Sequence, residues 1–539
     1  MTSEEQRSTN TPAPPAFGTS CMVSSAHPLA TQAGLDILTV GGNAFDAAVA
    51  IAATLNVVEP MSSGIGGYGL IVIYDAQRDD AWFLNCSGRI PAALDSDVFR
   101  PPTPNYLENR RGAKAVSTPG NLNAWEAMSK KYGKLEWRRL FNAAIKAADE
   151  GFIIGEKTAG FIQSEFPSFP EHAKSIYGHS GEPLKAGERL IQKDLAESLG
   201  LIAERGATAM YDGELGKVID AAMREAGGFL SMDDLHKDRT EWWKPISIDY
   251  RGHEIVTASP PANAFAMLVR LGMMSQFDLA ALGHNSVAYL HRYAEVTKHG
   301  FWVRLRYAGD PEVESPPLEM LLSEEYWAHE AARIDPQRAK PFEAPQTFSG
   351  QESHTTHFVV ADRWGNVVSA TLTVGDLFGS KIMPKGTGIW LNNSLQYCTF
   401  EPKGNPMDAF PGRHKLTGDC PTLIMRNGKP WVAIGTPGGR SVLQIVPQMV
   451  MNIVDFGMDV QQAIAAARIS FLEPDVIAVE ESIRQSVRNE LSAMGHTICV
   501  VDKLGNAHGL TIEYGSNGKP TQFAGGADPR GEGVAIGYG

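Results

Sequence analysis

The sequence predicts a layered fold that contains both helices and strands, and three observations support this prediction. Helix-like and strand-like segments alternate from about residue 26 onward, with few long linkers. The chain has 539 residues, of which 43% are hydrophobic and 20% are charged, as in an ordinary globular protein. No internal repeat and no low-complexity block follows the N-terminal segment. A chain of this length can bury a large core.

The N-terminal segment is rich in Pro, Ser and Thr, so we expect a disordered tail over residues 1–25. It has no basic start followed by an apolar run, and therefore does not have the form of a secretory signal. A buried helix is expected within residues 41–60, where Gly-Gly-Asn starts an Ala-rich stretch that Pro60 ends. Strands are expected at residues 69–76 and 82–87.

The rest of the chain divides into two parts by its pattern. The middle, roughly residues 120–345, is expected to be mostly helical, for example over 289–309. From residue 355 the sequence changes to short strands, Gly-rich turns and Pro. A helix is then expected over 441–456, and strands continue to the end of the chain.

The charge balance limits the class of partner. The 48 basic and 61 acidic residues give a formal net charge of −13, which argues against nucleic acid or an anionic membrane as partner. No stretch approaches 18 uninterrupted apolar residues. Five scattered cysteines without C-x-x-C spacing indicate reduced thiols, so we expect a cytoplasmic protein. A small-molecule partner fits this composition best.

Several familiar motifs are absent or misplaced. Gly64, Gly66 and Gly69 match G-x-G-x-x-G, but a strand-like segment follows where a dinucleotide-binding motif needs a helix. The chain has no Walker A loop, no H-E-x-x-H motif and no G-x-S-x-G elbow. His354 and His357 alone are weak evidence for a metal. We therefore predict neither a metal site nor a cofactor.

The most informative stretch begins at Thr355. Two apolar-rich runs flank the loop 363–365, which ends in a glycine, the residue that suits a left-handed position. If Asp362 faces Asn366, the same register places Thr355 opposite Thr373, with Cβ atoms roughly 4.5–5.5 Å apart. The two hydroxyls can then interact. From this pattern alone, two β-favouring threonines in a hairpin remain the simpler interpretation.

A second stretch, residues 435–452, contains a Pro-Gly-Gly turn between a strand and a helix. The backbone N–H groups of Gly438 and Gly439, at the positive end of that helix, would suit a developing oxyanion. Taken alone, a Pro-Gly-Gly segment is usually only a turn.

These two stretches belong to a longer series of segments that match, in the same order along the chain, the sequences of one known protein family. The others lie at residues 26–50, 59–69, 87–94, 115–125, 227–235, 249–261, 386–393 and 527–538. Over nearly its whole length the sequence resembles the γ-glutamyltransferase family of N-terminal-nucleophile hydrolases. Thr-Thr-His followed by Pro-Gly-Gly is the specific part of this resemblance.

The resemblance implies an α+β fold of four layers, an αββα sandwich, made as a single-domain precursor. Cleavage between His354 and Thr355 would leave a large subunit, 26–354 after the tail, and a small catalytic subunit, 355–539, as a heterodimer. The resemblance also implies that Thr355 is the nucleophile. A terminal α-amine has a pKa of about 7.7–8.0, so it can take the proton from the hydroxyl of its own residue. The other catalytic residues implied are Thr373, as the hydroxyl partner, and Gly438 and Gly439, as the oxyanion hole.

The residues that bind glutamate in this family are largely replaced here, so the chain resembles a divergent member. Ser87 stands where the family has a carboxylate-binding Arg, and Thr417-Gly418 stands in place of a Ser pair. The ligands of the α-amine are replaced as well, by Gly375, Ser394 and Tyr397. A buried substrate charge without a partner is costly, so these losses argue for an acyl group without a free α-amine.

Four residues remain candidates for substrate binding. Arg89 lies two residues beyond the position of the family's Arg and could still reach a carboxylate, although a structural ion pair explains it equally well. Asn393 ends one of the matching segments. Thr417 and Gly418 occupy the place of the Ser pair.

Three functions are therefore open. The first is hydrolysis of a small amide or acyl amide other than γ-glutamyl, of the oxamate or glutaryl-cephalosporin type, with water as the main acceptor. The second is a true γ-glutamyltransferase or glutathione hydrolase. The third is an inactive homologue with a binding or structural role, which the intact set of Thr355, Thr373, Gly438 and Gly439 argues against.

Overall fold

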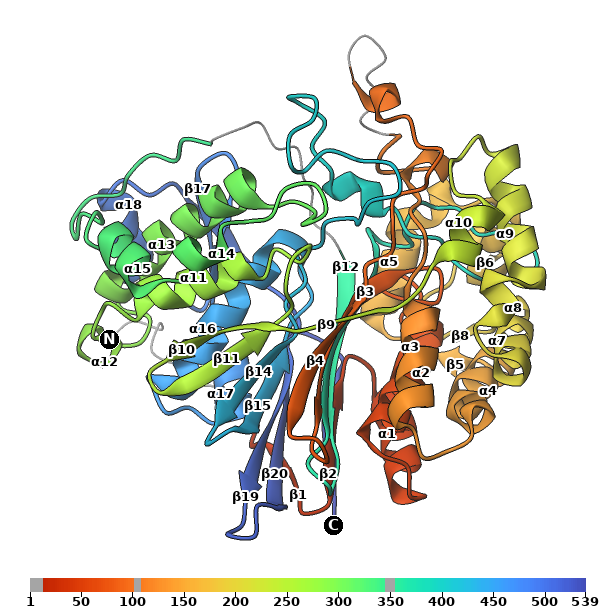
Figure 1. Cartoon of the computed structure of the whole chain (residues 1–539), viewed down its shortest axis with the longest axis horizontal. Helices are drawn as coiled ribbons and strands as arrows, with labels where there is room; N and C mark the ends of the chain where they lie inside the picture. The colour runs from red at the N-terminus through yellow and green to blue at the C-terminus, as the bar shows by residue number, and fades with distance from the viewer. Residues whose placement is uncertain (1–12, 101–107, 345–353) are drawn as a thin grey trace, which may run out of the picture.

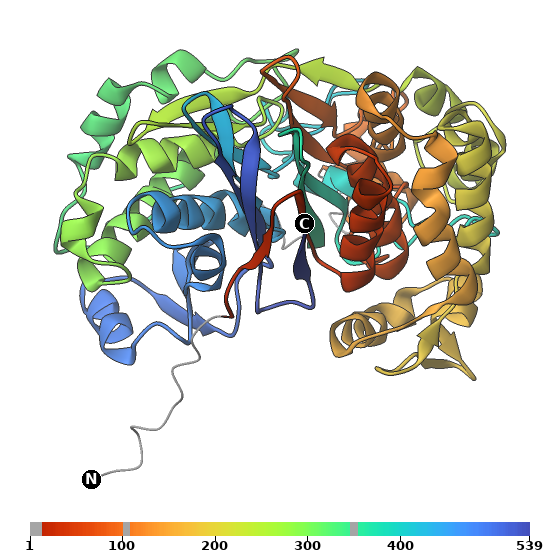
Figure 2. The same cartoon turned by 90° about the horizontal axis from the view of Figure 1, so that it is seen from below.

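Two seven-stranded sheets stacked face to face form the centre of the molecule, and helices cover the outer face of each (Figures 1 and 2). The computed structural model describes residues 13–100, 108–344 and 354–539. Helices from the first part of the chain lie on one side of the sheets, and helices from the middle and the C-terminal part lie on the other. The predicted four-layer αββα arrangement is therefore confirmed.

The first sheet has the strand order β21-β2-β12-β13-β3-β4-β9, and all of its neighbouring strands are antiparallel. In chain order its strands are β2 (Cys21–Ser25), β3 (Tyr68–Asp75), β4 (Asp80–Cys86), β9 (Glu241–Trp243), β12 (His354–Ala361), β13 (Val367–Gly375) and β21 (Val534–Tyr538).

The second sheet has the strand order β1-β20-β19-β15-β14-β11-β10 and is also antiparallel throughout. Its strands are β1 (Ala16–Gly18), β10 (Ile246–Tyr250), β11 (His253–Thr257), β14 (Thr422–Arg426), β15 (Lys429–Gly435), β19 (His508–Tyr514) and β20 (Pro520–Ala527). Both large sheets thus combine strands from before and after residue 355. Smaller sheets are formed by β16 (Ile469–Leu472), β17 (Val476–Glu480) and β18 (Ile498–Val501), by β5 (Phe152–Ile153) with β8 (Arg189–Leu190), and by β6 (Gly178–His179) with β7 (Glu182–Pro183).

The helical layers contain a set of helices for each sheet. Beside the first sheet are α1 (Pro28–Thr39), α2 (Ala44–Val58), α3 (Asn121–Tyr132), α4 (Asn142–Glu150), α5 (Glu156–Glu165), α6 (Glu171–Tyr177), α7 (Lys193–Arg205), α8 (Thr208–Tyr211), α9 (Glu214–Glu225) and α10 (Met232–Lys237). Beside the second are α11 (Phe265–Met274), α12 (Leu279–Leu282), α13 (Val287–Tyr307), α14 (Leu318–Leu321), α15 (Glu324–Ala331), α16 (Val442–Val454), α17 (Val460–Ala465) and α18 (Gln485–Ala493).

Helix α2 is the buried helix expected within residues 41–60. Asn43 and Asp46 form a capping box, in which each side chain accepts a hydrogen bond from the backbone N–H of the other residue. Every residue of the helix is buried, because α2 lies between the first sheet and the outer helices. The helix ends before Glu59, whose side chain reaches Thr356 of β12.

The hairpin of β12 and β13 has the register that the sequence predicts. The backbone N–H of Asp362 donates to the carbonyl oxygen of Asn366 at 3.1 Å, and Gly365 has a φ of 91°, in the left-handed region. Thr355 consequently lies directly opposite Thr373.

The prediction of a disordered tail over residues 1–25 is wrong for the part that the structure describes. Residues 16–18 form β1, and residues 21–25 form the fully buried β2, which pairs with β12 on one side and β21 on the other. The local composition hides these strands because their stability comes from pairing with segments far along the chain. Residues 1–12 lie outside the described residues.

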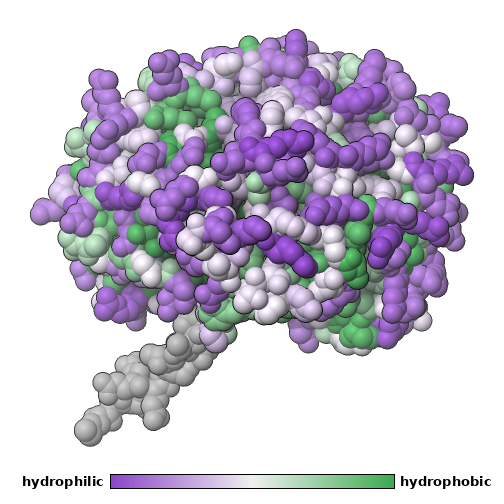
Figure 3. Space-filling model, turned by 60° about the horizontal axis from the view of Figure 1, so that its bottom comes forward, coloured by the Kyte–Doolittle hydropathy of each residue, from purple (hydrophilic) through white to green (hydrophobic). Residues whose placement is uncertain are grey.

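The surface and the thiols agree with the composition. The face in Figure 3 is mostly hydrophilic, with small hydrophobic areas between the charged side chains. In the described ranges no helix has the length and the apolar character needed to cross a bilayer. All five cysteines are free thiols, as predicted, and only Cys499 is exposed.

Candidate active site

Thr355 lies near the start of β12, on the face of the first sheet that is turned toward the second sheet. Side chains alternate between the two faces of a strand, and Val359 on the same face belongs to the core that also contains residues of β14 and β15. The Thr355 side chain is buried, and its Oγ1 donates to Oγ1 of Thr373 at 3.3 Å. The predicted contact between the two hydroxyls is present.

The hydroxyl of Thr373 connects Thr355 to the peptide bond that precedes it. Its Oγ1 donates to the carbonyl oxygen of His354 at 2.7 Å and accepts from the backbone N–H of Gly375 at 2.8 Å. A hydroxyl has one proton to donate and two lone pairs, and here all three are used. The Thr373 proton is therefore aimed at the His354 carbonyl, which it polarises.

The next two side chains of the Thr-Thr-His motif anchor the strand on opposite faces. Oγ1 of Thr356 donates to Glu59 Oε2 at 2.8 Å, and Glu59 Oε1 accepts from Lys157 Nζ at 2.7 Å. Burial raises the pKa of Glu59, but the charge and hydrogen bond of Lys157 bring it below its ordinary value. On the other face, His357 Nδ1 lies 2.9 Å from Oγ1 of Thr371. These contacts fix the position of β12 next to Thr355.

The Pro-Gly-Gly turn begins beside β12. Gly435, the last residue of β15, packs on the ring of His357, where an added Cβ would lie only 2.3 Å from the ring. Three residues further, Gly438 has a φ of 138° and Gly439 has a φ of 54°, and both values favour glycine. The chain then enters a short 3₁₀ turn and α16, as the sequence predicts.

Thr417 and Gly418 lie next to this turn. A Cβ on Gly418 would be 3.5 Å from the carbonyl oxygen of Gly439, so the two glycines are neighbours. The Thr417 hydroxyl donates to Asp419 Oδ2 at 2.6 Å. The structure thus brings the segment that replaces the family's Ser pair together with the predicted oxyanion glycines.

The amide of Asn393 is engaged within the protein. Its Nδ2 donates to the carbonyl oxygen of Arg110 at 2.7 Å, and its Oδ1 accepts from the backbone N–H of Asp376 at 3.0 Å. Gly375 has a φ of 101°, and an added Cβ there would lie 1.9 Å from Asn393 Oδ1. Asn393 therefore shapes the loop after β13, and that loop has no room for an amine-binding side chain at residue 375.

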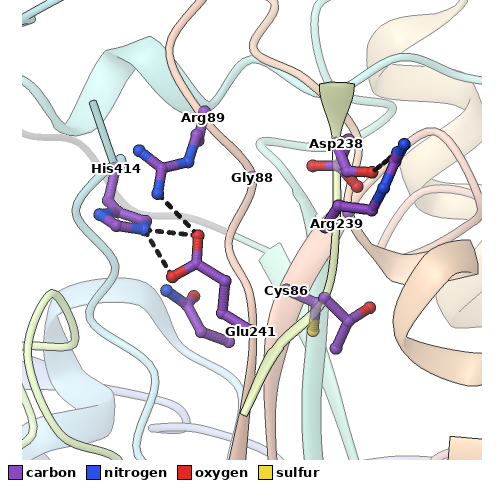
Figure 4. A pocket seen from close by; sticks show the side chains of 10 residues that line it. Cys86, Gly88, Arg89, Asp238, Arg239, Glu241 and His414 are labelled. Atoms are coloured by element: carbon purple, nitrogen blue, oxygen red, sulfur yellow. Dashed lines mark hydrogen bonds and ion pairs between the residues drawn. The ribbon is translucent and has the colours of Figure 1, made fainter. Parts of the chain in front are cut away.

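Arg89 is held by carboxylates in what we call the charged cluster, which consists of Arg89, Glu241, Asp310, Glu312 and His414. Arg89 lies 2.7 Å from Glu241 and 3.1 Å from Glu312, and Figure 4 shows its guanidinium turned toward Glu241. The cavity that Figure 4 shows between Arg89, Asp238 and Glu241 measures about 10 Å³, enough for about one water molecule. Of the two interpretations of Arg89, the structure supports the ion pair.

His414 is the buried centre of the charged cluster. Its Nδ1 lies 3.0 Å from Asp310 and its Nε2 lies 2.9 Å from Glu241. Burial lowers the pKa of His414, but these two carboxylates outweigh it and raise the pKa to about 9. Asp310, Glu312 and His414 are close enough to offer ligands to a metal ion, and both ring nitrogens of His414 face carboxylates.

Two residues at the site, Tyr68 and Lys415, were not among the site residues predicted from the sequence. Tyr68 is paired with Thr373 across β3 and β13, so its side chain shares the face that bears Thr355. The amine of Lys415 lies 2.9 Å from the centre of the Tyr68 ring, and Lys415 is completely buried. Burial lowers the pKa of this amine well below its ordinary value and raises the pKa of the nearby Asp419 to about 6. The only available signal was a lysine two residues before the substituted Ser pair.

Comparison with known families agrees with this geometry. The family model described as gamma-glutamyltranspeptidase matches residues 30–538. The chain belongs to the γ-glutamyltranspeptidase family. Its α+β sandwich is the N-terminal-nucleophile hydrolase fold of that family.

The similar proteins include hydrolases and acylases. The chain is 34% identical to a glutathione hydrolase proenzyme from Bacillus subtilis over 540 residues, which cover 96% of this chain and 91% of that protein. It is 35% identical to an acylase ACY 1 proenzyme from Pseudomonas over 496 residues, with coverage of 90% and 88%. The structure of cephalosporin acylase from Bacillus halodurans matches with a TM-score of 0.91 and 28% identity over 100% of both chains.

Proposed function

We propose that this γ-glutamyltranspeptidase-family protein is a self-cleaving amide hydrolase with Thr355 as its N-terminal nucleophile. The observation that carries this proposal is the chain of hydrogen bonds from Thr355 through Thr373 to the His354 carbonyl. It places a hydroxyl nucleophile, a second hydroxyl and a polarised peptide carbonyl together at the residue where a precursor must be cut.

Maturation would begin with attack of Thr355 Oγ1 on the carbonyl carbon of His354. The C–N bond of the peptide breaks, the nitrogen of Thr355 gains a proton and becomes a free amine, and His354 is left as an ester on Thr355. Water then hydrolyses the ester, which leaves a carboxylate on His354 and restores the Thr355 hydroxyl. The hydrogen bond from Thr373 favours the first step, because it stabilises the charge that develops on the carbonyl oxygen.

The new amine would serve as the base for catalysis. It takes the proton of the Thr355 hydroxyl as the oxygen attacks the substrate amide, and the departing amine leaves with a proton. The acyl group remains as an ester on Thr355 until water releases it as an acid. The N–H groups of Gly438 and Gly439 would stabilise the oxyanion in both steps.

The two polypeptides would stay together as a heterodimer. The nucleophile strand β12 is hydrogen-bonded to β2 from the first part of the chain, and β13 is hydrogen-bonded to β3. Both large sheets contain strands from each polypeptide, so separation of the two polypeptides would break the sheets apart. It would expose their buried faces and these strand edges to water, so association is strongly favoured.

The substrate would be an acyl amide without a free α-amine. Gly375 has no room for a side chain, and the Asn393 amide is engaged in the loop after β13. The hydroxyl of Ser394 donates to Ser117, so it is also used within the protein. The alternative, a true γ-glutamyl hydrolase or transferase, is supported by the similarity to the glutathione hydrolase proenzyme.

The maturation step is tested by comparing the wild type with Thr355→Ala and Thr355→Ser on denaturing gels and by mass spectrometry. We expect the wild type and the serine variant to give one polypeptide that ends at His354 and one that begins at residue 355. The alanine variant should remain one chain. A wild-type protein that hydrolyses amides while still uncut would contradict the proposal.

The substrate class is tested with a panel on the cleaved enzyme. Release of p-nitroaniline from γ-glutamyl-p-nitroanilide would favour the alternative, whereas acid release from glutaryl amides or ammonia from oxamate would favour the proposal. Failure of Thr355 to become labelled by any acylating electrophile would instead indicate an inactive homologue.

A further inference from the structure

Lys415 is a buried amine without a hydrogen-bonding or ion-pair partner among the described residues. In the described part of the chain its Nζ has no hydrogen-bond acceptor and no carboxylate at ion-pair distance. Its contacts are with the faces of two aromatic rings, Tyr68 at 2.9 Å and Tyr397 at 5.6 Å. An ammonium group buried in this way is destabilising unless an anion joins it.

No described group contacts the Lys415 amine directly as an anion. Burial lowers the pKa of Lys415 and the charge of Asp419 raises it, but neither oxygen of this carboxyl group lies at ion-pair distance from the amine, and its Oδ2 accepts from the Thr417 hydroxyl at 2.6 Å. Cys86 and Cys398 are buried thiols whose pKa values burial raises, so they stay neutral. The position therefore has an amine donor that no described residue uses and that a ligand could engage.

This donor lies on the same side of the sheet as the nucleophile. Thr355 is opposite Thr373, and Thr373 is opposite Tyr68, so the three side chains form one row across β12, β13 and β3. The row spans two strand spacings, which is about 10 Å. Lys415 lies over the ring at the far end of this row from Thr355.

We propose that Lys415 recognises a carboxylate at the end of the acyl group that Thr355 accepts, which makes the substrate a monoamide of a dicarboxylic acid. This inference rests on the proposed amide hydrolysis at Thr355. It assigns to Lys415 the recognition of charge that the sequence analysis considered for Arg89, whose guanidinium is held by Glu241 and Glu312.

The spacing also selects the length of the acyl chain. An extended five-carbon diacid places its two carbonyl carbons roughly 5 Å apart, and a hydrogen bond to an amine adds about 3 Å. A glutaryl group is therefore long enough to span most of this row. An oxalyl group, whose two carbonyl carbons are directly bonded, does not, so we expect glutaryl amides to be preferred to oxamate.

The test compares glutaryl-p-nitroanilide with valeryl-p-nitroanilide, which has the same number of carbons and no carboxylate. For the cleaved wild-type enzyme we expect kcat/KM to be about 100-fold higher for the glutaryl substrate, because a buried charge pair forms only with that substrate. In Lys415→Met this ratio should fall to about one, mainly through a higher KM for the glutaryl substrate. Arg413→Met is the matched control, since it removes an exposed cation two residues away and should keep the wild-type ratio.

Two further measurements do not depend on a variant that retains activity. Free glutarate should inhibit the wild-type enzyme competitively and valerate should not. The melting temperature of Lys415→Met should be equal to or higher than that of the wild type, because the variant replaces an unpaired buried amine with an apolar side chain. A lysine with a purely structural role would give a lower melting temperature.

The outcomes separate this inference from the proposed function. If the enzyme cleaves itself and hydrolyses valeryl and glutaryl amides equally well, the role of Lys415 is overturned and the role of Thr355 stands. The same holds if Lys415→Met keeps the wild-type ratio. If the wild type is never cleaved and never acylated, the proposed function itself fails.

Discussion

His414 and Lys415 are neighbours in the sequence but lie in opposite electrostatic environments. His414 is surrounded by carboxylates and held by Asp310 and Glu241, and Arg89 is paired in the same charged cluster. Lys415 is equally buried, yet its amine contacts aromatic rings on the face that bears Thr355. One residue step therefore separates a cluster in which both cations are paired with carboxylates from an amine with no carboxylate at ion-pair distance.

This difference shows how to decide whether a basic side chain has a structural role or binds a ligand. A guanidinium that already donates to two carboxylates gains little from a third anion and would have to break existing bonds to reach it. A buried amine without an acceptor gains the full benefit of pairing. The identity of the residue, Arg or Lys, is less informative than the acceptors around it.

The largest expected effect comes from the row of side chains that begins at Thr355. Thr373→Val keeps the shape of the side chain and removes the hydroxyl that donates to the His354 carbonyl. We expect self-cleavage to slow by about 10²–10³-fold, the usual effect of losing one donor to a developing oxyanion. The rate is measured by following the fraction of cut chain after expression or refolding.

Thr371→Val is the matched control, because it makes the same change two residues away on the same face of β13. It removes the hydrogen bond to His357 and should lower stability, but self-cleavage should stay within a few fold of the wild type. Equal cleavage rates in Thr373→Val and the wild type would remove Thr373 from the mechanism.

The second effect concerns the charged cluster and the pH dependence of stability. The pKa of His414 is raised from 6.5 to about 9 in the folded protein, so the stabilisation is complete below pH 6.5 and is lost as the pH rises through 9. The full change corresponds to about 3 kcal/mol in the free energy of unfolding. Urea unfolding between pH 6 and pH 10 should show this decline, measured in a Thr355→Ala background so that the chain stays intact.

The difference between the parent and His414→Gln isolates this contribution from other titrating groups. It should be largest near pH 6 and should shrink toward pH 10. A difference that stays constant with pH would mean that His414 is not protonated in the fold, and the contrast with Lys415 would lose its basis.

The smallest effect is expected at Arg89. Arg89→Met removes partly exposed ion pairs to Glu241 and Glu312, so unfolding should become easier by only about 1 kcal/mol. The preference for the glutaryl over the valeryl substrate should not change. A loss of that preference in Arg89→Met, with Lys415→Met unaffected, would reverse the comparison and make Arg89 the carboxylate ligand.

Local patterns in the sequence were sufficient to predict the hairpin that carries Thr355, the proposed nucleophile. Alternating apolar residues and a glycine at residue 365 determine the β12–β13 hairpin, and with it the pairing of Thr355 and Thr373. The start signal at Asn43 likewise determines where α2 begins. These features depend on residues within one hairpin or one helical turn, so a pattern of a few residues is enough to predict them.

The elements that the sequence did not reveal depend on contacts between distant segments. Strand β2 is stable because β12 and β21 pair with it, and its own residues do not show this. Arg89 is engaged by Glu241 and Glu312, which lie far along the chain. The sequence could therefore not decide whether Arg89 binds a substrate carboxylate or forms a structural ion pair.

The sequence by itself determined the family, the layered fold, the nucleophile candidate and the loss of the glutamate-binding residues. The tertiary structure alone decided which charges remain available to a substrate, holding Arg89 in ion pairs and leaving the amine of Lys415 over Tyr68. The physical reason is that the availability of a charge depends on its burial and on the acceptors within hydrogen-bonding distance. Those acceptors come from segments that only folding brings together.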